Sequence, residues 1–315
     1  MALFVLRRFA ILIASVFAAS VLVFVVLAAL PGDAAEVQLG DQATPEALAA
    51  LRHELGLDVP LVVQYGRWMG GVVRGDLGTS YVSSLPVGAQ IRDRLFVTGP
   101  LALFGMTLAV LIAAPAGVYS AAHHRRLGDA VVSALTQLGM AVPAFWAGIM
   151  LITLVSVKLH WLPAGGFVPW GQDVGGALRS LVLPAVSIAL VQGAILTRYV
   201  RSAVLDVLRE DYIRTARARG RTRTGALVRH GLRNAAIPVV TVLGLQLSFL
   251  IAGAVVVENV FFLPGLGRML LRAIGDRDLL LVQGTVLMLT VVVLVVNFLV
   301  DLAYHYLDPR LRTAT

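Results

Sequence analysis

Six long apolar runs constrain this chain more than any other feature. They lie at about residues 9–30, 99–122, 131–157, 179–199, 235–257 and 280–303. A transmembrane helix needs about 20 apolar residues to cross a hydrocarbon core roughly 30 Å thick, and each run is long enough. Buried helices of a soluble protein are the alternative, but these runs have little polar face. Hydrophobic residues also make up 58% of the chain, against about 45–50% in soluble domains. The runs therefore predict an all-α integral membrane protein with six transmembrane helices.

The first run is longer than the hydrophobic region of a cleaved signal peptide. It extends from Phe9 to Leu30, follows Arg7 and Arg8, and ends at Pro31-Gly32-Asp33. A signal peptide has an apolar region of about 7–15 residues, followed by a small-residue cleavage site. We therefore expect this run to be retained as the first transmembrane helix.

Arginine placement predicts the orientation in the membrane. The chain carries 25 arginines and a single lysine, Lys158. The arginines gather in four places, which are Arg7 and Arg8, Arg125 and Arg126, ten positions from Arg198 to Arg233, and Arg310 and Arg312. With six spans, all four places fall on one side. Positive residues mark cytoplasmic loops, so we expect a multi-pass membrane protein with both termini in the cytoplasm.

Residues 31–98, after the first run, predict a small helical insertion on the extracytoplasmic side. Thr44-Pro45-Glu46 offers an N-cap, a proline at the first helical position and an acid at the positive end of the helix dipole. Gly56 suits the C-terminal cap of that helix. The aromatic stretch Val62–Val73 is typical of a helix on the membrane surface. Gly75-Asp76-Leu77-Gly78 then predicts a turn.

The loop at 200–234 predicts a helix–turn–helix between the fourth and fifth spans. Val204, Leu208, Tyr212 and Ala216 recur at every fourth position, which predicts one apolar face on an otherwise basic helix. Gly220 ends this helix, and a second amphipathic piece begins at about Thr224. Small residues at the turn, which are Ala216, Ala218 and Gly220, would let a partner surface approach closely.

The spacing from Thr215-Ala216-Arg217 through Gly220 to Ile237-Pro238 resembles the EAA loop of permeases in binding-protein-dependent ABC importers. The triplet lacks the glutamate of the idealised motif, as is common in the dipeptide/oligopeptide branch. The resemblance implies that the loop is a coupling helix that docks on an ATPase subunit. The coupling residues would be Tyr212, Thr215, Ala216, Arg217, Ala218 and Gly220.

The similarity to the dipeptide/oligopeptide branch extends over nearly the whole chain. It is carried by Pro31-Gly32-Asp33, Ala43-Thr44-Pro45-Glu46, Leu55-Gly56-Leu57-Asp58, Val63-Gln64-Tyr65, Gly75-Asp76-Leu77-Gly78, Val257-Glu258-Asn259-Val260-Phe261, Pro264-Gly265-Leu266-Gly267-Arg268, Arg277-Asp278 and Leu307-Asp308-Pro309-Arg310. Phe96 departs from the pattern, because the branch usually has a proline there.

This resemblance implies that residues 1–315 form a single transmembrane domain, which is half of a translocation path for peptides working by alternating access. Nickel, haem or another small solute is the alternative cargo. The implied location is the bacterial inner membrane. The implied partners are a second homologous permease, two ABC ATPase subunits and an extracytoplasmic solute-binding protein. No Gly-x-x-x-x-Gly-Lys-[Ser/Thr] motif occurs, so we expect no cofactor and no catalytic residue in this chain, and ATP and Mg to be bound by the ATPase partners.

Other functions find less support in the residues. A gradient-driven transporter is expected to carry paired acids inside its spans, and none lies well inside a run. No catalytic set suggests a membrane enzyme, and the absence of cysteine excludes disulfides and thiolate chemistry. The basic loop lacks the interleaved aromatics of a nucleic-acid site, although anionic lipid could attract it. His123-His124 is interpreted as a loop pair, since adjacent histidines do not share a helix face.

Polar residues inside the apolar runs are candidates for the translocation path or for the contact with a second permease. They are Gln137, Gln192, Gln246, Ser248 and Asn297. The alternative is hydrogen bonding between helices of the same chain. Glu258, at the outer end of the fifth run, is interpreted as an outer-gate residue with Arg268, or as an ion-pair partner of Arg268 or Arg272.

Overall fold

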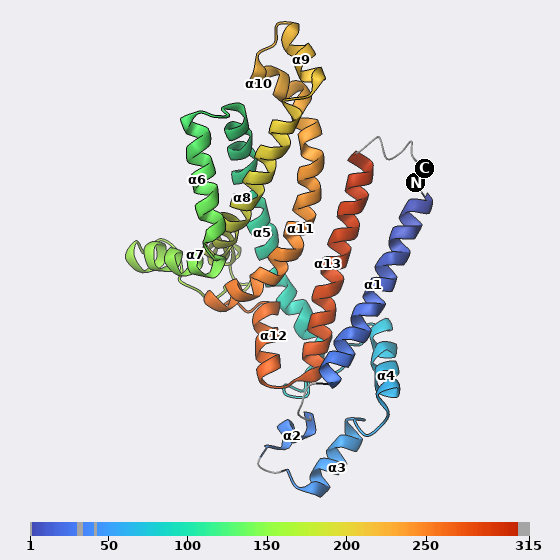
Figure 1. The fold of residues 1–315 in the computed structure, drawn as a ribbon. Helices are drawn as coiled ribbons and strands as arrows, with labels where there is room; N and C mark the ends of the chain where they lie inside the picture. Colours follow the sequence, from blue (N-terminus) through green and yellow to red (C-terminus); the bar gives the residue numbers. More distant parts are fainter. Residues whose placement is uncertain (1, 30–33, 41–42, 308–315) are drawn as a thin grey trace. The chain divides into compact units, whose positions relative to one another are not determined.

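The computed structural model describes residues 2–29, 34–40 and 43–307, and these residues are almost entirely helical. In chain order the helices are α1 (Ala2–Ala28), α2 (Ala34–Leu39), α3 (Pro45–Glu54), α4 (Leu61–Val73), α5 (Val87–Ala122), α6 (Leu127–Ala141), α7 (Ala144–Leu151), η2 (Ile152–Lys158), α8 (Val174–Val207), α9 (Asp211–Ala218), α10 (Arg223–Ala226), η3 (Leu227–Gly231), α11 (Leu232–Val260), α12 (Leu266–Gly275) and α13 (Leu279–Leu307), where η marks a π-helical segment (Figure 1). The predicted motif Pro31-Gly32-Asp33, the tail from Asp308, and with it Arg310 and Arg312, lie outside the described residues.

Five helices in the described part of the chain are long and apolar enough to cross a membrane. They include Val5–Ala28, Val87–Ala122, Val174–Val207, Arg223–Ile251 and Leu279–Leu302. The all-helical membrane fold is therefore confirmed. The expected sixth span is different, because α6 and α7 with η2 form a pair bent by 99°. Six spans result only if this bent pair crosses the membrane as one.

Pro143 explains why the predicted helix over 131–157 is broken. A proline has no backbone N–H and disfavours helical geometry in the residue before it. Val142 is extended, with ψ of 122°, and Pro143 takes ψ of 142° as the residue that precedes α7. The helix is therefore completely broken at Pro143. Pro184, in contrast, lies within the unbroken helix α8.

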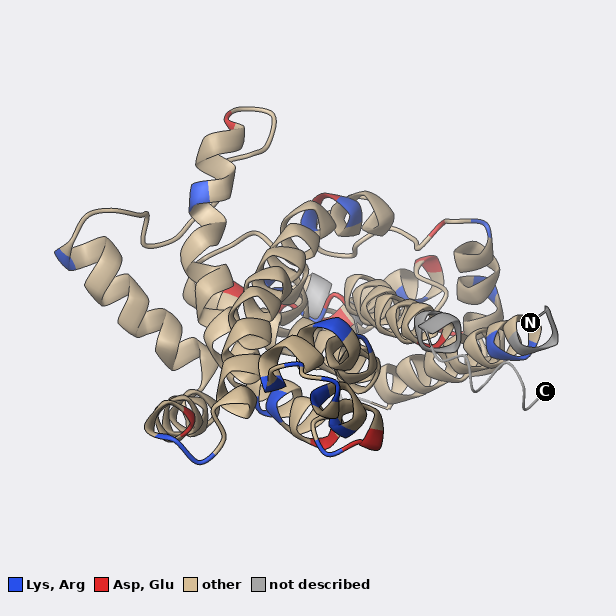
Figure 2. Cartoon of the chain, turned by 90° about the horizontal axis from the view of Figure 1, so that it is seen from above, with Lys and Arg blue, Asp and Glu red and all other residues tan. Residues whose placement is uncertain are grey.

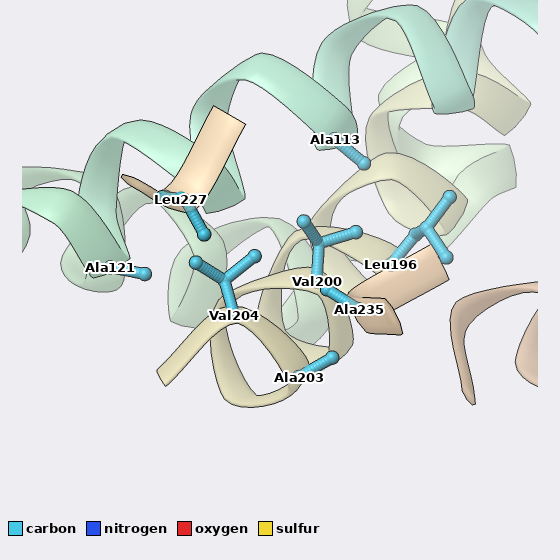
Figure 3. Packing of buried hydrophobic residues seen from close by; sticks show 8 residues of the cluster. All are labelled: Ala113, Ala121, Leu196, Val200, Ala203, Val204, Leu227 and Ala235. Atoms are coloured by element: carbon cyan, nitrogen blue, oxygen red, sulfur yellow. The ribbon is translucent and has the colours of Figure 1, made fainter. Parts of the chain in front are cut away.

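The chain divides into two compact units, and the first contains residues 1–5, 99–263 and 296–315. Its centre is α8, which contacts α6, α7 and α11. Small and branched side chains of α5, α8, η3 and α11 form a core there, with Ala113, Ala121, Leu196, Val200, Ala203, Val204, Leu227 and Ala235 buried (Figure 3). Gly117 permits a close approach in this core, since a Cβ atom at that position would lie 2.7 Å from Val200. Close backbone packing of this kind is typical of helix contacts in membranes.

The small residues Gly244 and Ser248 of α11 pack within the same unit. A Cβ atom on Gly244 would lie 2.6 Å from Val300 of α13, and the Ser248 hydroxyl lies 3.3 Å from Asn297 Oδ1. Gly244 and Ser248 are four residues apart on α11, and they allow α13 of the same chain to approach closely.

The second unit contains residues 6–98 and 264–295. The predicted N-cap is confirmed, because the Thr44 hydroxyl accepts a hydrogen bond from Ala47 N at 3.2 Å at the start of α3. Gly56 follows α3 with φ of +66°, as a C-terminal cap requires. The turn predicted at 75–78 is also present, with positive φ at both of its glycines. Val87 and Ile91 of α5 pack in a core with α12 and α13. Helix α12 was not predicted from the sequence.

Candidate ATPase-coupling site

The loop at 200–234 contains two short helices, but the first of them does not continue α8. Helix α8 ends at Val207, and the chain turns at residues 208–210 before α9 begins at Asp211. The predicted single helix with an apolar stripe over 204–216 is therefore wrong. The turn changes the register, so that Ile213 rather than Tyr212 is buried, at 1% exposure against 39%.

Ile213 holds α9 against the rest of the loop. Its Cδ1 atom would lie 3.6 Å from a Cβ atom on Gly231, and such an atom would also lie 3.0 Å from Val207 and 2.8 Å from Leu227. The absence of a side chain on Gly231 thus allows Leu227 and Val207 to approach closely, and Ile213 packs beside them. Burying one isoleucine stabilises this arrangement by about 1.5–3 kcal/mol.

A polar contact fixes the other side of α9. Asn234, in the first turn of α11, donates a hydrogen bond from Nδ2 to the Tyr212 hydroxyl at 2.9 Å. Together with Ile213, this bond joins the short helix to the start of the next span. Helix α9 is thus attached to the start of α11 by this hydrogen bond, and to the end of α8 and η3 by the buried contacts of Ile213.

The remaining predicted coupling residues form the outer face and end of α9. Arg217 and Ala218 are exposed, Ala216 is half-buried, and the Thr215 hydroxyl bonds back to Asp211 O at 3.0 Å. Gly220 lies beyond the helix with φ of +85°, and nothing is within 4 Å of the position a side chain would take. This backbone conformation favours glycine strongly over residues with a side chain.

The structure confirms that a second helix follows the Gly220 turn. The Thr222 hydroxyl accepts a hydrogen bond from Gly225 N at 3.1 Å and caps α10. Helix α10 continues through η3 into α11, so the loop leads directly into a candidate span. The turn between the two helices thus has an ordered hydrogen-bonded geometry on each side.

The exposed surface of the loop is strongly basic. Figure 2 shows arginine residues gathered over α9 and α10, and exposed arginines occur at positions 209, 214, 217, 219, 221 and 223. Asp211 compensates only part of this charge, since its carboxylate accepts a hydrogen bond from Arg214 at 3.2 Å. A partner that docks here therefore gains from an acidic surface.

A buried ion pair anchors the end of α8, next to this loop. Arg201 donates from Nε and Nη2 to the two carboxylate oxygens of Asp129, at 2.8 and 2.9 Å. Ser120 and the backbone N of Arg125 donate to the same carboxylate, and His124 Nδ1 lies 3.0 Å from it. The pair joins three helices, α5, α6 and α8, at one end of the unit.

Sequence reasoning missed this ion pair. Asp129 and Arg201 lie 72 residues apart, and neither belongs to a recognisable motif. The available signal was the acid itself, since Asp129 precedes an apolar run in a chain with few acids in such places.

The predicted path residues are not brought together as one site. Gln137 is exposed, and Ser248 contacts Asn297 as described above. Among the described residues, Gln192 Oε1 and Gln246 Nε2 are buried atoms without a hydrogen-bond partner. Their assignment to a translocation path stays a prediction.

Glu258 and Arg268 belong to different units, so their predicted pairing also stays a prediction. Glu258 lies in the last turns of α11 with 0% exposure, and Arg268 lies half-buried on α12.

Truncating Ile213 is expected to loosen α9. An Ile213→Ala change should cost about 2–4 kcal/mol of docking energy, because it removes a fully buried side chain. Trypsin should then cut the arginine-rich loop at least about ten times faster in the native protein, because cleavage follows the population of the open form. Tyr212→Phe is the matched control, since it removes one hydroxyl worth about 0.5–1.5 kcal/mol. Equal cleavage of Ile213→Ala and wild type would show that Ile213 does not hold the helix.

Comparison with known families identifies both parts of the chain. Residues 113–313 match the family described as binding-protein-dependent transport system inner membrane component. Residues 1–102 match the N-terminal part described for membrane components of the same systems. The two matches together leave only residues 103–112 and the last two residues outside.

Several curated proteins are similar over the full length. A protein of Brucella abortus (strain 2308), named as a candidate peptide transport system permease, is 44% identical over 308 residues, which are 98% of each chain. The glutathione transport system permease protein GsiC of Salmonella paratyphi A is 39% identical over 309 residues, again 98% of each chain. A solved structure of the MetNI methionine ABC transporter, in an inward-facing conformation, shares the fold with a TM-score of 0.59 at 16% identity. That match covers 70% of this chain and 96% of the other.

Proposed function

Because this chain belongs to the family of binding-protein-dependent transport system inner membrane components, we propose that it forms half of a peptide path driven from its coupling loop. The chain is a membrane permease of a binding-protein-dependent ABC importer. Such an importer works with ATPase and solute-binding partners. The proposal adds the cargo, the mechanism and the residues through which ATP hydrolysis acts on this chain.

The loop at α9 and α10 is the proposed contact with the ATPase. One observation supports this contact most strongly. Helix α9 is held in place by the buried Ile213, while its basic outer face is exposed. A rigid helix attached to α8 and α11 transmits displacement, whereas a flexible loop absorbs it. Tyr212, Thr215, Ala216, Arg217, Ala218 and Gly220 form or follow this helix, and we assign the coupling to them.

The proposed assembly has two permeases and two ATPase subunits, with a solute-binding protein on the outer side. ATP and Mg are bound and ATP is hydrolysed by the ATPase subunits, and this chain has no catalytic residue. ATP binding closes the ATPase pair, the loop moves with it, and the helices reorient around the solute. In this arrangement both termini and the loop face the cytoplasm, in keeping with the arginine distribution.

Peptides are the proposed cargo. Relatives of this chain are named for peptide and glutathione transport, and they match over 98% of their length. Nickel, haem or another small solute remains the second candidate, supported by the wider membership of the branch that the motifs resemble. Competition distinguishes the two candidate cargo classes, since excess unlabelled dipeptide inhibits uptake only if peptides are the cargo.

Affinity purification of this chain from gently solubilised membranes tests the proposal. We expect two ATP-binding subunits and a second permease to be recovered with it, together with ATPase activity, and labelled dipeptide uptake after reconstitution with the solute-binding protein. Recovery of the chain alone, without ATPase activity, would contradict the assembly. Uptake of Ni²⁺ or haem but of no dipeptide would contradict the cargo.

A further inference from the structure

A small cavity in the second unit is lined by three arginines. It has a volume of about 210 Å³ and lies between the start of α5, the turn at residues 79–86 and helix α12. Arg94 comes from α5, and Arg268 and Arg272 come from α12. The two arginines of α12 are four residues apart and so share one face of the helix.

These guanidinium groups converge although like charges repel. The pKa of Arg268 is lowered from its ordinary value, first by burial and then by the charges of Arg272 and Arg94. A helix that only needed an amphipathic shape would gain stability with uncharged residues here, because like charges at this spacing are unfavourable. The arrangement therefore favours an anion in the cavity.

Two acids, Asp276 and Asp278, line the cavity together with the arginines. Asp278 is buried and is used by other donors, since it accepts hydrogen bonds from the Ser80 hydroxyl and from the backbone N of Tyr81 and Leu281. Asp276 is exposed at the end of α12. Among the described residues, neither carboxylate forms an ion pair with Arg94 or Arg272, so these two guanidinium groups are available to an anion.

Two of the arginines have donors to spare. Arg94 donates from Nη1 to the Pro264 carbonyl at 3.4 Å, which is a weak bond and leaves its other N–H groups available. Arg272 is exposed, and no carboxylate among the described residues lies within ion-pair distance of it. Planar guanidinium groups bind a carboxylate with paired N–H donors, which gives geometric selectivity as well as energy.

We propose that this cavity is a carboxylate site that receives the carboxyl group of the imported solute. The proposal rests on peptide transport as the proposed function and deepens it, because every unmodified linear peptide carries one terminal carboxylate. The α12 segment lies between the fifth and sixth apolar runs, so with six spans and a cytoplasmic N-terminus it belongs to the extracytoplasmic side, where the solute arrives. The cavity is smaller than pockets that hold whole ligands, which have volumes of about 300–1,000 Å³, so its size suits a carboxylate with its adjoining groups.

Direct binding of dialanine tests the site. The transporter, purified through this chain and held in nanodiscs, is titrated calorimetrically with dialanine and with dialanine amide. We expect dialanine to bind at least about ten-fold more tightly than its amide, because only the free carboxylate pairs with guanidinium groups. Arg272→Gln and Arg94→Gln should each lower the affinity for dialanine about ten-fold and leave the affinity for the amide unchanged.

Two further variants make the result specific. Arg92→Gln is the matched control, because Arg92 is exposed on the same helix as Arg94, lies near Asp93 and does not line the cavity. Its affinity should equal that of wild type. Arg272→Lys keeps the charge without the paired donors and should bind with intermediate affinity.

Equal binding of dialanine and its amide, unchanged affinity in both glutamine variants, or no binding to the wild type would overturn the site. Uptake is measured separately with the same proteins. A transporter that binds dialanine through Arg272 but imports no peptide contradicts the proposed cargo alone. One that imports peptide while binding is independent of both arginines contradicts the site alone.

Discussion

A Gly220→Val transporter is expected to insert into the membrane normally and to lose at least about nine-tenths of its ATP-driven uptake. Gly220 has φ of +85°, which a β-branched residue adopts only as a strained outlier. A left-handed conformation costs a residue with a side chain about 1–2 kcal/mol, and about 1.4 kcal/mol changes a population ten-fold. Since Gly220 joins α9 to α10, the strain should displace the helix that we assign to coupling.

The measurement separates coupling from folding. Uptake and ATPase activity are assayed on reconstituted transporter, and insertion is checked by the amount of chain in washed membranes. We expect insertion to be unchanged, because Gly220 is exposed and has open space around it. Normal uptake by Gly220→Val would contradict the coupling assignment.

Gly220→Asn distinguishes two reasons for the same loss. Asparagine tolerates positive φ better than other residues with a side chain, so the turn should survive this change. Retained uptake would show that the backbone conformation at Gly220 is what coupling requires. Lost uptake would show instead that a partner surface approaches Gly220 too closely for any side chain.

The transmembrane framework could be predicted because long apolar runs have few other solutions. The runs at 99–122, 179–199, 235–257 and 280–303 lie within single long helices of the structure, and the first run is helical as far as Ala28. The local signals in the outer segment were equally direct, since Thr44 and Gly56 act through their immediate neighbours. Patterns that depend on a few adjacent residues are thus readable from the sequence.

Features set by distant contacts could not be predicted. Leu208 and Glu210 give no glycine or proline signal for the turn between α8 and α9, so a continuous helix was the natural interpretation. The break at Pro143 was foreseeable, but its angle of 99° depends on how α6 and α7 pack on α8.

Helix α12, in contrast, could have been predicted from the sequence. Leu266, Met269 and Ala273 recur at helical spacing and are all buried.

The pair of Asp129 and Arg201 also depends on distant contacts, and its removal is the second large effect that we expect. The Asp129 side chain is 8% exposed and that of Arg201 28%, and paired hydrogen bonds join them. Asp129→Ala leaves the guanidinium without its carboxylate partner. Breaking a buried ion pair from one side costs about 3–5 kcal/mol, and the partial exposure of Arg201 favours the lower end.

Thermal unfolding of the purified transporter measures this cost, and a double-mutant cycle assigns it to the pair. Asp129→Ala and Arg201→Met should each lower the unfolding midpoint by several degrees, since about 1 kcal/mol shifts it by roughly 2–4 °C in a chain of this size. The double variant should be more stable than the sum of the two losses predicts, because no unpaired charge remains. Ser133→Ala is the control, since its hydroxyl lies 3.4 Å from the same carboxylate and contributes little. Strict additivity of the two single changes would show that the ion pair does not hold α8 to the turn between α5 and α6.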